Sequence, residues 1–106
     1  MQELVEPPDL DIVIPVYNEA ENIAKVLGAL KGHVRTRFRV LICYDHDHDN
    51  TLPVVRNFTG LEIVLVKNRG KGPHGAVMTG FSSCVAPAIL VYPADTYFPY
   101  SRNLLR

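Results

Sequence analysis

Polar side chains able to bind a ligand occur in four short clusters, and each cluster directly follows an apolar run. The first is Pro15-Val16-Tyr17-Asn18-Glu19, in which an aromatic ring stands close to a carboxylate. Such a ring can flank a planar base, and the carboxylate can accept a hydrogen bond from a base N–H. The structural alternative is that Asn18 is the N-cap of a helix, with Glu21 completing a capping box.

The second cluster, Asp45-His46-Asp47-His48-Asp49, has the residue types of a metal site. A calcium loop needs Gly at its sixth place and Glu at its twelfth, where this chain has Asn50 and Arg56. A zinc site would have His46 and His48 but no later pair of ligands. We therefore expect one or two of the aspartates to meet a ligand and the histidines to be solvated.

The third cluster contains a glycine pattern. Residues 70–75 read GKGPHG and fit G-x-G-x-x-G, and Asp95 lies 20 residues after Gly75, where a ribose-binding acid would belong. This favours, as an alternative, a dinucleotide-binding Rossmann domain of an oxidoreductase. Two features oppose it: residues 67–69 separate the apolar run from the first glycine, and the fingerprint normally opens its domain.

Basic residues on the same loop, Arg69 and Lys71, suit a diphosphate through cation contacts and free backbone N–H groups. Asp95 follows the fourth apolar run. One carboxylate beside a diphosphate can hold Mg²⁺ or Mn²⁺, which take oxygen ligands. An Asp in this place also suits a simple cap.

Four β-rich apolar runs predict strands at residues 11–16, 38–44, 61–66 and 88–92. Three helices are predicted between them. The first ends near Gly32 and buries residues spaced at i, i+3, i+4 and i+7, namely Ile23, Val26, Leu27 and Leu30. Thr51 caps the short second helix, and the third follows the glycine loop with an inner face of Val77, Gly80, Phe81 and Cys84.

The alternation of strands and helices predicts an α/β fold of three layers, a parallel βαβ sheet covered on both faces. Right-handed crossovers place every strand-to-helix loop at one edge of the sheet. Ligands of open α/β sheets bind at this carboxyl edge. The four polar clusters are therefore expected to meet in one site.

The composition is that of a globular domain, with 47% hydrophobic and 21% charged residues in a chain of 106. Eleven basic residues balance eleven acidic ones, which argues against a nucleic-acid partner. The opening MQELVEPPDL is unlike a signal peptide, and no apolar run approaches a membrane span, so a cytoplasmic location is expected. Cys43 and Cys84 are expected to be reduced core residues.

Taken in order, the four clusters resemble the motifs of family 2 glycosyltransferases of GT-A fold, most closely the branch that makes polyprenyl- or dolichyl-phosphate sugars. Residues 13–19 read VIPVYNE, like that family's first motif. Residues 49–51 fit the end of its acidic loop, which runs toward D-G-T, although Tyr44 stands where many members have an Asp. Its third loop, N-x-G-K-G-x-x-x-A, is matched by Asn68, Gly70, Lys71, Gly72 and Ala76. Its D-x-D is reduced to Pro93-Ala94-Asp95.

The resemblance implies a GT-A half that binds a nucleotide-diphosphate sugar. It implies that the base and ribose are bound by Pro15, Tyr17, Glu19 and Asp45. Lys71 would approach the nucleotide, and Asp95 would hold Mg²⁺ or Mn²⁺. The implied reaction is transfer of the sugar, a hexose in the expected case, to an acceptor such as a polyprenyl phosphate at the cytosolic membrane face.

Members of this family continue well beyond the point where this chain ends, and that part supplies the acceptor site and the general base. Residues 96–106 contain no carboxylate that could act as this base. We therefore expect residues 1–106 to be a single partial domain that carries the donor-binding portion, with its catalytic residue unidentified. A truncated, non-catalytic nucleotide-binding module is the remaining alternative.

Overall fold

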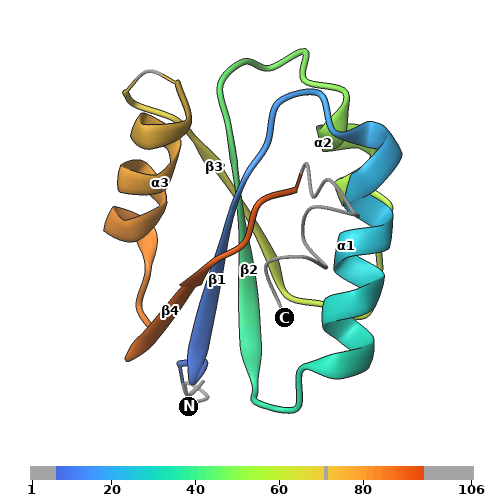
Figure 1. Ribbon diagram of the computed structural model, residues 1–106, viewed down its shortest axis with the longest axis vertical. Helices are drawn as coiled ribbons and strands as arrows, with labels where there is room; N and C mark the ends of the chain where they lie inside the picture. The colour runs from blue at the N-terminus through green and yellow to red at the C-terminus, as the bar shows by residue number, and fades with distance from the viewer. Residues whose placement is uncertain (1–6, 71, 95–106) are drawn as a thin grey trace, which may run out of the picture.

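The computed structural model describes residues 7–70 and 72–94, which form a sheet with helices on both faces (Figure 1). The strands are β1 (Leu10–Pro15), β2 (Phe38–Tyr44), β3 (Ile63–Lys67) and β4 (Ala88–Val91). The helices are α1 (Ala20–His33), α2 (Thr51–Arg56) and α3 (Gly72–Ser83). The predicted α/β fold is confirmed, and the predicted strands lie within two residues of the observed ones.

All four strands are parallel, in the order β3-β2-β1-β4. The chain first winds outward from β1 to β3, and then returns across the sheet so that β4 pairs with the other side of β1. Because each crossover is right-handed, this reversal puts α3 on one face and α1 and α2 on the other (Figure 1). The order of strands therefore changes direction at β1, which is a topological switch point.

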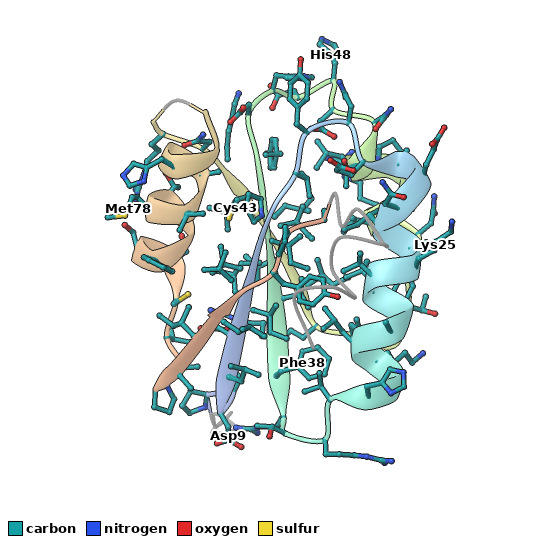
Figure 2. All side chains as sticks on the ribbon, viewed as in Figure 1. Asp9, Lys25, Phe38, Cys43, His48 and Met78 are labelled. Carbon is teal, nitrogen blue, oxygen red and sulfur yellow. The ribbon has the colours of Figure 1, made fainter. Side chains whose placement is uncertain are left out.

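Apolar side chains fill the space on both faces of the sheet. On one face, α1 buries the four residues predicted for it, Ile23, Val26, Leu27 and Leu30. They pack against inward residues of β1 and β2 such as Ile12 and Ile42. On the other face Val13, Leu41 and Cys43 lie beneath α3 (Figure 2). Successive strand residues thus supply opposite faces, as the pleat requires.

Helix α3 packs on the sheet through small residues. Ala76, Thr79 and Gly80 are buried, whereas Phe81 is 40% exposed, so the predicted inner face is right for Gly80 and wrong for Phe81. A Cβ atom on Gly80 would lie 2.6 Å from Cγ1 of Val13. The helix therefore approaches β1 too closely to admit a large side chain on this side.

The two cysteines are free, as expected, and Cys43 is fully buried while Cys84 is partly buried. Burial raises the pKa of the Cys43 thiol to about 12. This thiol is therefore protonated at neutral pH and serves as a packing group beneath α3.

A buried ion pair lies near the end of the sheet where the strands begin, opposite to the polar clusters. Asp11 of β1 has no exposed surface, and its Oδ1 lies 2.9 Å from Nε of Arg39 on β2. Asp11 also accepts hydrogen bonds from the backbone N–H groups of Val85 and Ala86, which lie between α3 and β4. One carboxylate thus ties β1, β2 and the start of β4 together.

Strand β4 exposes apolar side chains on both faces of the sheet. Ile89, Leu90 and Val91 are each 39–45% exposed, although neighbouring residues of a strand point to opposite faces. Within the described residues β4 pairs with β1 alone, so its second edge has no partner there. An edge strand with exposed apolar side chains is prone to pair with another chain.

We expect the 106-residue chain to self-associate through β4, and we expect Leu90→Lys to reduce this association. A charge on an edge strand opposes edge-to-edge pairing, and sedimentation velocity over a range of concentrations would measure the change. Met78→Lys is the control, because Met78 is 50% exposed but lies on the outer side of α3 (Figure 2). Equal association of both variants and the unchanged chain would contradict an interface at β4.

Candidate functional site

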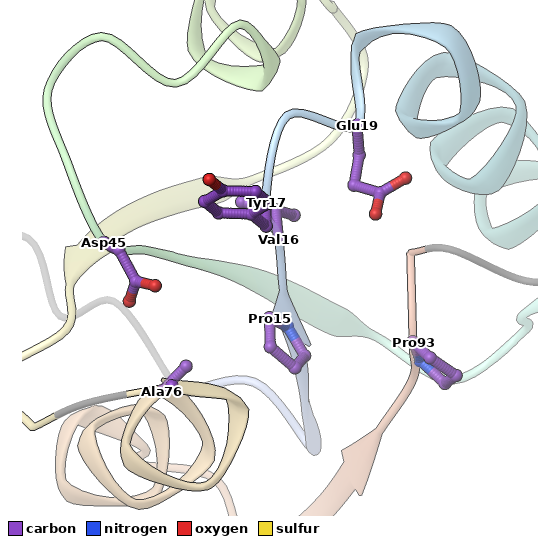
Figure 3. A pocket seen from close by; sticks show the side chains of 8 residues that line it. Pro15, Val16, Tyr17, Glu19, Asp45, Ala76 and Pro93 are labelled. Carbon is purple, nitrogen blue, oxygen red and sulfur yellow. The ribbon is translucent and has the colours of Figure 1, made fainter.

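A cavity of about 400 Å³ lies at the carboxyl ends of β1, β2 and β4 (Figure 3). It is where the strand order reverses, the usual place for a ligand in an open α/β sheet. Its walls come from the first three clusters found in the sequence, from α3, and from Pro93 of the fourth cluster, which follows β4. They are Pro15, Val16, Tyr17, Glu19, Asp45, Gly72, Ala76 and Pro93.

Pro15 explains why a gap opens at this point of the sheet. β1 pairs with β2 as far as Pro15, but it pairs with β4 only as far as Val13. The carbonyl of Val13 accepts from Tyr92 of the β4 segment, so Pro15, two residues on, faces the same neighbour. Proline has no N–H to continue this ladder, and the cavity begins where the β1–β4 pairing ends.

Two carboxylates and one aromatic ring face the cavity. Tyr17 is 64% exposed, and its ring stands between the carboxylates of Asp45 and Glu19 in the close view (Figure 3). The ring of His46 meets that of Tyr17 edge-on, with ring centroids 5.8 Å apart. An exposed ring held from one side presents its remaining surface to a planar ligand.

The loops that follow β1 and β2 are joined by reciprocal hydrogen bonds. The N–H of Asn18 donates to Oδ2 of Asp49 over 3.1 Å, and Oδ1 of Asn18 accepts from the N–H of Asn50. Thr51 Oγ1 accepts from the N–H of Glu19. We call this set of contacts between residues 18–20 and 49–51 the loop clasp. It holds Glu19 against the second loop, and Tyr17 directly precedes Asn18 of the clasp.

The loop clasp corrects the predicted helix caps. The N-cap of α1 is Glu19 rather than Asn18, and Glu21 makes no capping box. The N–H of Ala20, at the start of α1, donates instead to Oδ1 of Asn50. Asn18 has φ = 52°, a left-handed conformation that Asn tolerates better than most residues. It therefore serves as the corner that turns the chain from β1 into α1.

Asp49 is structural, although it belongs to the acidic cluster. It is 1% exposed, and its two carboxylate oxygens accept from the N–H groups of Asn18 and Thr51. The N-cap of α2 is Asn50, one residue before the predicted Thr51. Of the cluster's three aspartates, Asp49 holds the loop, Asp47 pairs with Lys67 at the surface, and Asp45 lines the cavity.

Among the described residues, the histidines of this cluster are not part of a group of three metal-binding side chains. His48 is exposed and points outward from the loop, as expected (Figure 2), whereas His46 is half-buried and its ring contacts Tyr17, so it is solvated only in part. Within residues 7–70 and 72–94, no three His, Cys, Asp or Glu side chains converge to hold a metal ion. Asp95, the predicted metal ligand, and Lys71 lie outside the described residues.

Arg69 does not line the cavity. It lines a separate hollow of about 470 Å³ on the side of α3, together with His74 and Met78. The structure therefore brings together Pro15, Tyr17, Glu19 and Asp45 but not Arg69. Sequence reasoning assigned no individual role to Asn68, which donates to Asp45 over 2.7 Å. The signals in the sequence were its position after a strand and its match to the first residue of the N-x-G-K-G-x-x-x-A motif.

Residues 11–104 match the sequence profile of the family described as glycosyl transferase family 2. The chain belongs to this family. The described half of a GT-A fold, a parallel sheet alternating with helices, agrees with family 2 membership. The glycine loop follows β3, an edge strand, whereas a dinucleotide fingerprint follows the strand at the switch point, so the Rossmann alternative is not supported.

Three relatives illustrate the similarity. Undecaprenyl-phosphate 4-deoxy-4-formamido-L-arabinose transferase of Pseudomonas savastanoi pv. phaseolicola is 27% identical over 97 residues, covering 85% of this chain and 29% of the relative. Glycosyltransferase AglE of Haloferax volcanii is 32% identical over 105 residues, covering 93% and 34%. Probable glycosyltransferase YdaM of Bacillus subtilis is 28% identical over 102 residues, covering 89% and 24%.

This family 2 chain spans about a third or less of the length of these relatives. None of the helices that the structure describes is long and apolar enough to cross a membrane.

Proposed function

We propose that this chain binds the nucleotide-diphosphate sugar of a glycosyl transfer reaction in the cavity at the β1 switch point. The observation that carries the proposal is that Tyr17, Glu19 and Asp45 line one cavity at the edge where ligands of such sheets bind. In the reaction, the sugar moves from the nucleoside diphosphate to an acceptor, with inversion at the sugar carbon.

Charge sets the direction in which the donor lies. Glu19 and Asp45 are carboxylates and repel a diphosphate, so these two side chains suit the neutral base and ribose. There they accept hydrogen bonds from base N–H or ribose hydroxyl groups, while Tyr17 flanks the base. The ring and the two carboxylates thus recognise the nucleoside.

The wall formed by the start of α3 suits the diphosphate. Gly72 is the first residue of α3 and lines the cavity, so the partial positive charge of the helix N-terminus lies at this wall. Lys71 precedes it in the sequence and adds a positive charge to the same loop. Together these groups stabilise the negative charge of the departing nucleoside diphosphate.

Family 2 enzymes of this fold commonly use a divalent metal ion. We propose Asp95 as a ligand of Mg²⁺ or Mn²⁺. When bound, the ion would neutralise charge on the diphosphate. The described residues contribute no group of three ligands for it.

The acceptor and the whole reaction are proposed from the relatives. One relative is an undecaprenyl-phosphate transferase, and we propose a polyprenyl phosphate as the acceptor here too. A lipid phosphate lies at a membrane, so we place the protein in the cytoplasm at that membrane face. We propose residues 1–106 as the donor-binding portion of a longer transferase domain, because the relatives are about three times as long.

Binding of the donor is measurable by isothermal titration calorimetry. We expect heat with a UDP- or GDP-sugar in the presence of Mn²⁺ and no heat with NAD(P). Asp45→Ala should weaken the donor affinity at least about tenfold, because a hydrogen bond to a charged group contributes about 1.5–3 kcal/mol.

The matched control is Asp47→Ala. Asp47 lies on the same loop, but it is exposed and pairs with Lys67 outside the cavity. Its replacement should leave the affinity within about twofold of that of the unchanged chain. Heat with NAD(P) alone, or an equal loss in both variants, would reject the proposed site.

A further inference from the structure

The side chain of Asn68 is saturated with hydrogen bonds. Its Nδ2 donates to Oδ1 of Asp45 over 2.7 Å and to the carbonyl of Gly72 over 3.1 Å. Its Oδ1 accepts from the N–H of Gly70 over 2.8 Å and from Oγ1 of Thr79 over 3.2 Å. A side-chain amide has two donor hydrogens and two acceptor lone pairs, so every one of them is used.

The partners of Asn68 belong to three separate segments. Asp45 ends the β2 segment, Gly70 and Gly72 belong to the glycine loop, and Thr79 lies in the body of α3. Thr79 is 6% exposed, and its Oγ1 also accepts from the N–H of Arg69 over 3.1 Å. The amide of Asn68 is therefore fixed by a buried group on a helix and cannot rotate without losing bonds.

The glycine loop packs closely around the side-chain amide of Asn68. A Cβ atom on Gly75 would lie 3.0 Å from the carbonyl carbon of Gly70 and 3.1 Å from Oδ1 of Asn68. The loop is thus packed directly onto α3 at the point where Asn68 is held. Because α3 and the glycine loop hold the side chain of Asn68, Asn68 can in turn hold the carboxylate of Asp45, to which it donates.

Asp45 itself is exposed and has few restraints. Asn68 is the hydrogen-bond donor to its carboxylate, and no other side chain in the described part of the chain donates to it. The bond engages Oδ1, and no side chain among residues 7–70 and 72–94 donates to Oδ2. Without Asn68, the carboxylate would sample several rotamers and would have to be ordered when a ligand binds.

We propose that Asn68 is a positioning residue that orients the Asp45 carboxylate for the ligand before it binds. This inference rests on the proposed function, because it takes the cavity of Asp45 as the donor site. Ordering a mobile side chain on binding costs affinity, so loss of Asn68 should weaken donor binding about 3- to 10-fold.

A double-mutant cycle in donor affinity tests this role. The four proteins are the unchanged chain, Asn68→Ala, Asp45→Ala and the double variant, each titrated with the same UDP- or GDP-sugar and Mn²⁺. If Asn68 acts through Asp45, the loss caused by Asn68→Ala will be at least threefold smaller when Asp45 is already alanine. Equal losses in both backgrounds would mean a merely structural role and would overturn the proposal.

Thr79 supplies a second test that keeps Asn68 in place. Thr79→Val removes the hydroxyl that fixes the amide of Asn68, whereas Thr79→Ser keeps it. We expect the valine variant to lose donor affinity in the same direction as Asn68→Ala, and the serine variant to stay within about twofold of the unchanged chain. Equal affinity of the two variants, both showing a cooperative thermal transition, would contradict the proposal.

The two proposals fail in different ways. If the unchanged chain binds no nucleotide sugar, the proposed function fails and the role of Asn68 fails with it. If the unchanged chain binds the donor and Asp45→Ala weakens it, but the losses from Asn68→Ala are equal in both backgrounds, only the role of Asn68 is rejected.

Discussion

Replacement of Asp11 by alanine should lower the free energy of unfolding by about 3–5 kcal/mol, because it leaves a largely buried guanidinium without its charge partner. Asp11 is completely buried and Arg39 has a side-chain exposure of 14%. The pair is bidentate, with Arg39 Nε and Nη2 lying 2.9 and 3.2 Å from the two carboxylate oxygens. The loss would be a large part of the stability of a small domain.

The effect should extend beyond the ion pair to the connection between α3 and β4. The N–H groups of Val85 and Ala86 donate to Oδ2 of Asp11 over 2.7 and 2.9 Å. Alanine at position 11 removes the acceptor of both groups. The start of β4 would then lose its link to the central strand, and β4 itself is held in the described sheet only by β1.

The stabilisation by Asp11 also depends on pH. Burial raises the pKa of this carboxyl, but the hydrogen bonds from Arg39, Ala86 and Val85 outweigh burial, and the pKa lies below the ordinary 3.8. Because the pKa is lower in the folded than in the unfolded state, the stabilisation is fully present above the unfolded-state pKa. It is lost as the pH falls through the folded-state value, below 3.8.

Urea unfolding followed by circular dichroism measures this prediction. At pH 7 the variant should unfold at much lower urea than the unchanged chain, and the difference should shrink as the pH falls below 3.8. Lys67→Ala is the control, since it breaks an exposed pair with Asp47 and should cost less than about 1 kcal/mol. Similar losses in both variants would show that the buried pair has no special contribution.

Replacement of Asp49 by alanine should both destabilise the chain and weaken donor binding. The change leaves two N–H groups, those of Asn18 and Thr51, without their acceptor in a buried place. Each unsatisfied group costs about 1–3 kcal/mol, so the total loss of stability should be roughly 2–6 kcal/mol. The loop clasp would lose the bond from the N–H of Asn18, which lies between Tyr17 and Glu19, and we expect at least about a tenfold loss of donor affinity.

The two effects of Asp49→Ala are separable by experiment. Urea unfolding gives the stability, and calorimetry with the nucleotide sugar below the unfolding transition gives the affinity. Asp47→Ala is the matched control, because it removes an exposed carboxylate two positions earlier in the same loop. A variant that is destabilised but binds the donor normally would show that the loop clasp does not position Tyr17 and Glu19.

The repeating parts of the fold were predictable from the sequence. The apolar spacing of α1 predicted its buried face correctly, because period alone determines which side of a helix is apolar. Strand β2 has the predicted bounds, since Arg39 alone interrupts its run of β-branched, aromatic and apolar residues from Phe38 to Tyr44. The meeting of Tyr17 and Asp45 at one cavity followed from parallel topology, which gathers loops at one edge.

The capping and positioning contacts could not be predicted in the same way. Asn18 has the residue type of a local N-cap, but its partner is 32 residues away at Asn50. The four bonds of Asn68 likewise depend on how the glycine loop returns to β2 and α3. Phe81 was misplaced because α3 is apolar on several sides, so periodicity did not identify its inner face. Hydrogen bonds between distant segments leave no regular pattern in a sequence.

The loop clasp also bears on how this domain folds. Helix α1 begins with backbone N–H groups whose acceptors, Asn50 and Thr51, are supplied only after β2 and its loop are in place. Its N-terminal turn therefore cannot be completed as a local event, and the segment from β1 to α2 forms as one cooperative unit. We therefore expect the amide hydrogens of Glu19 and Ala20 to exchange with solvent when the loop clasp opens, so their protection would report how often the two loops beside the cavity separate.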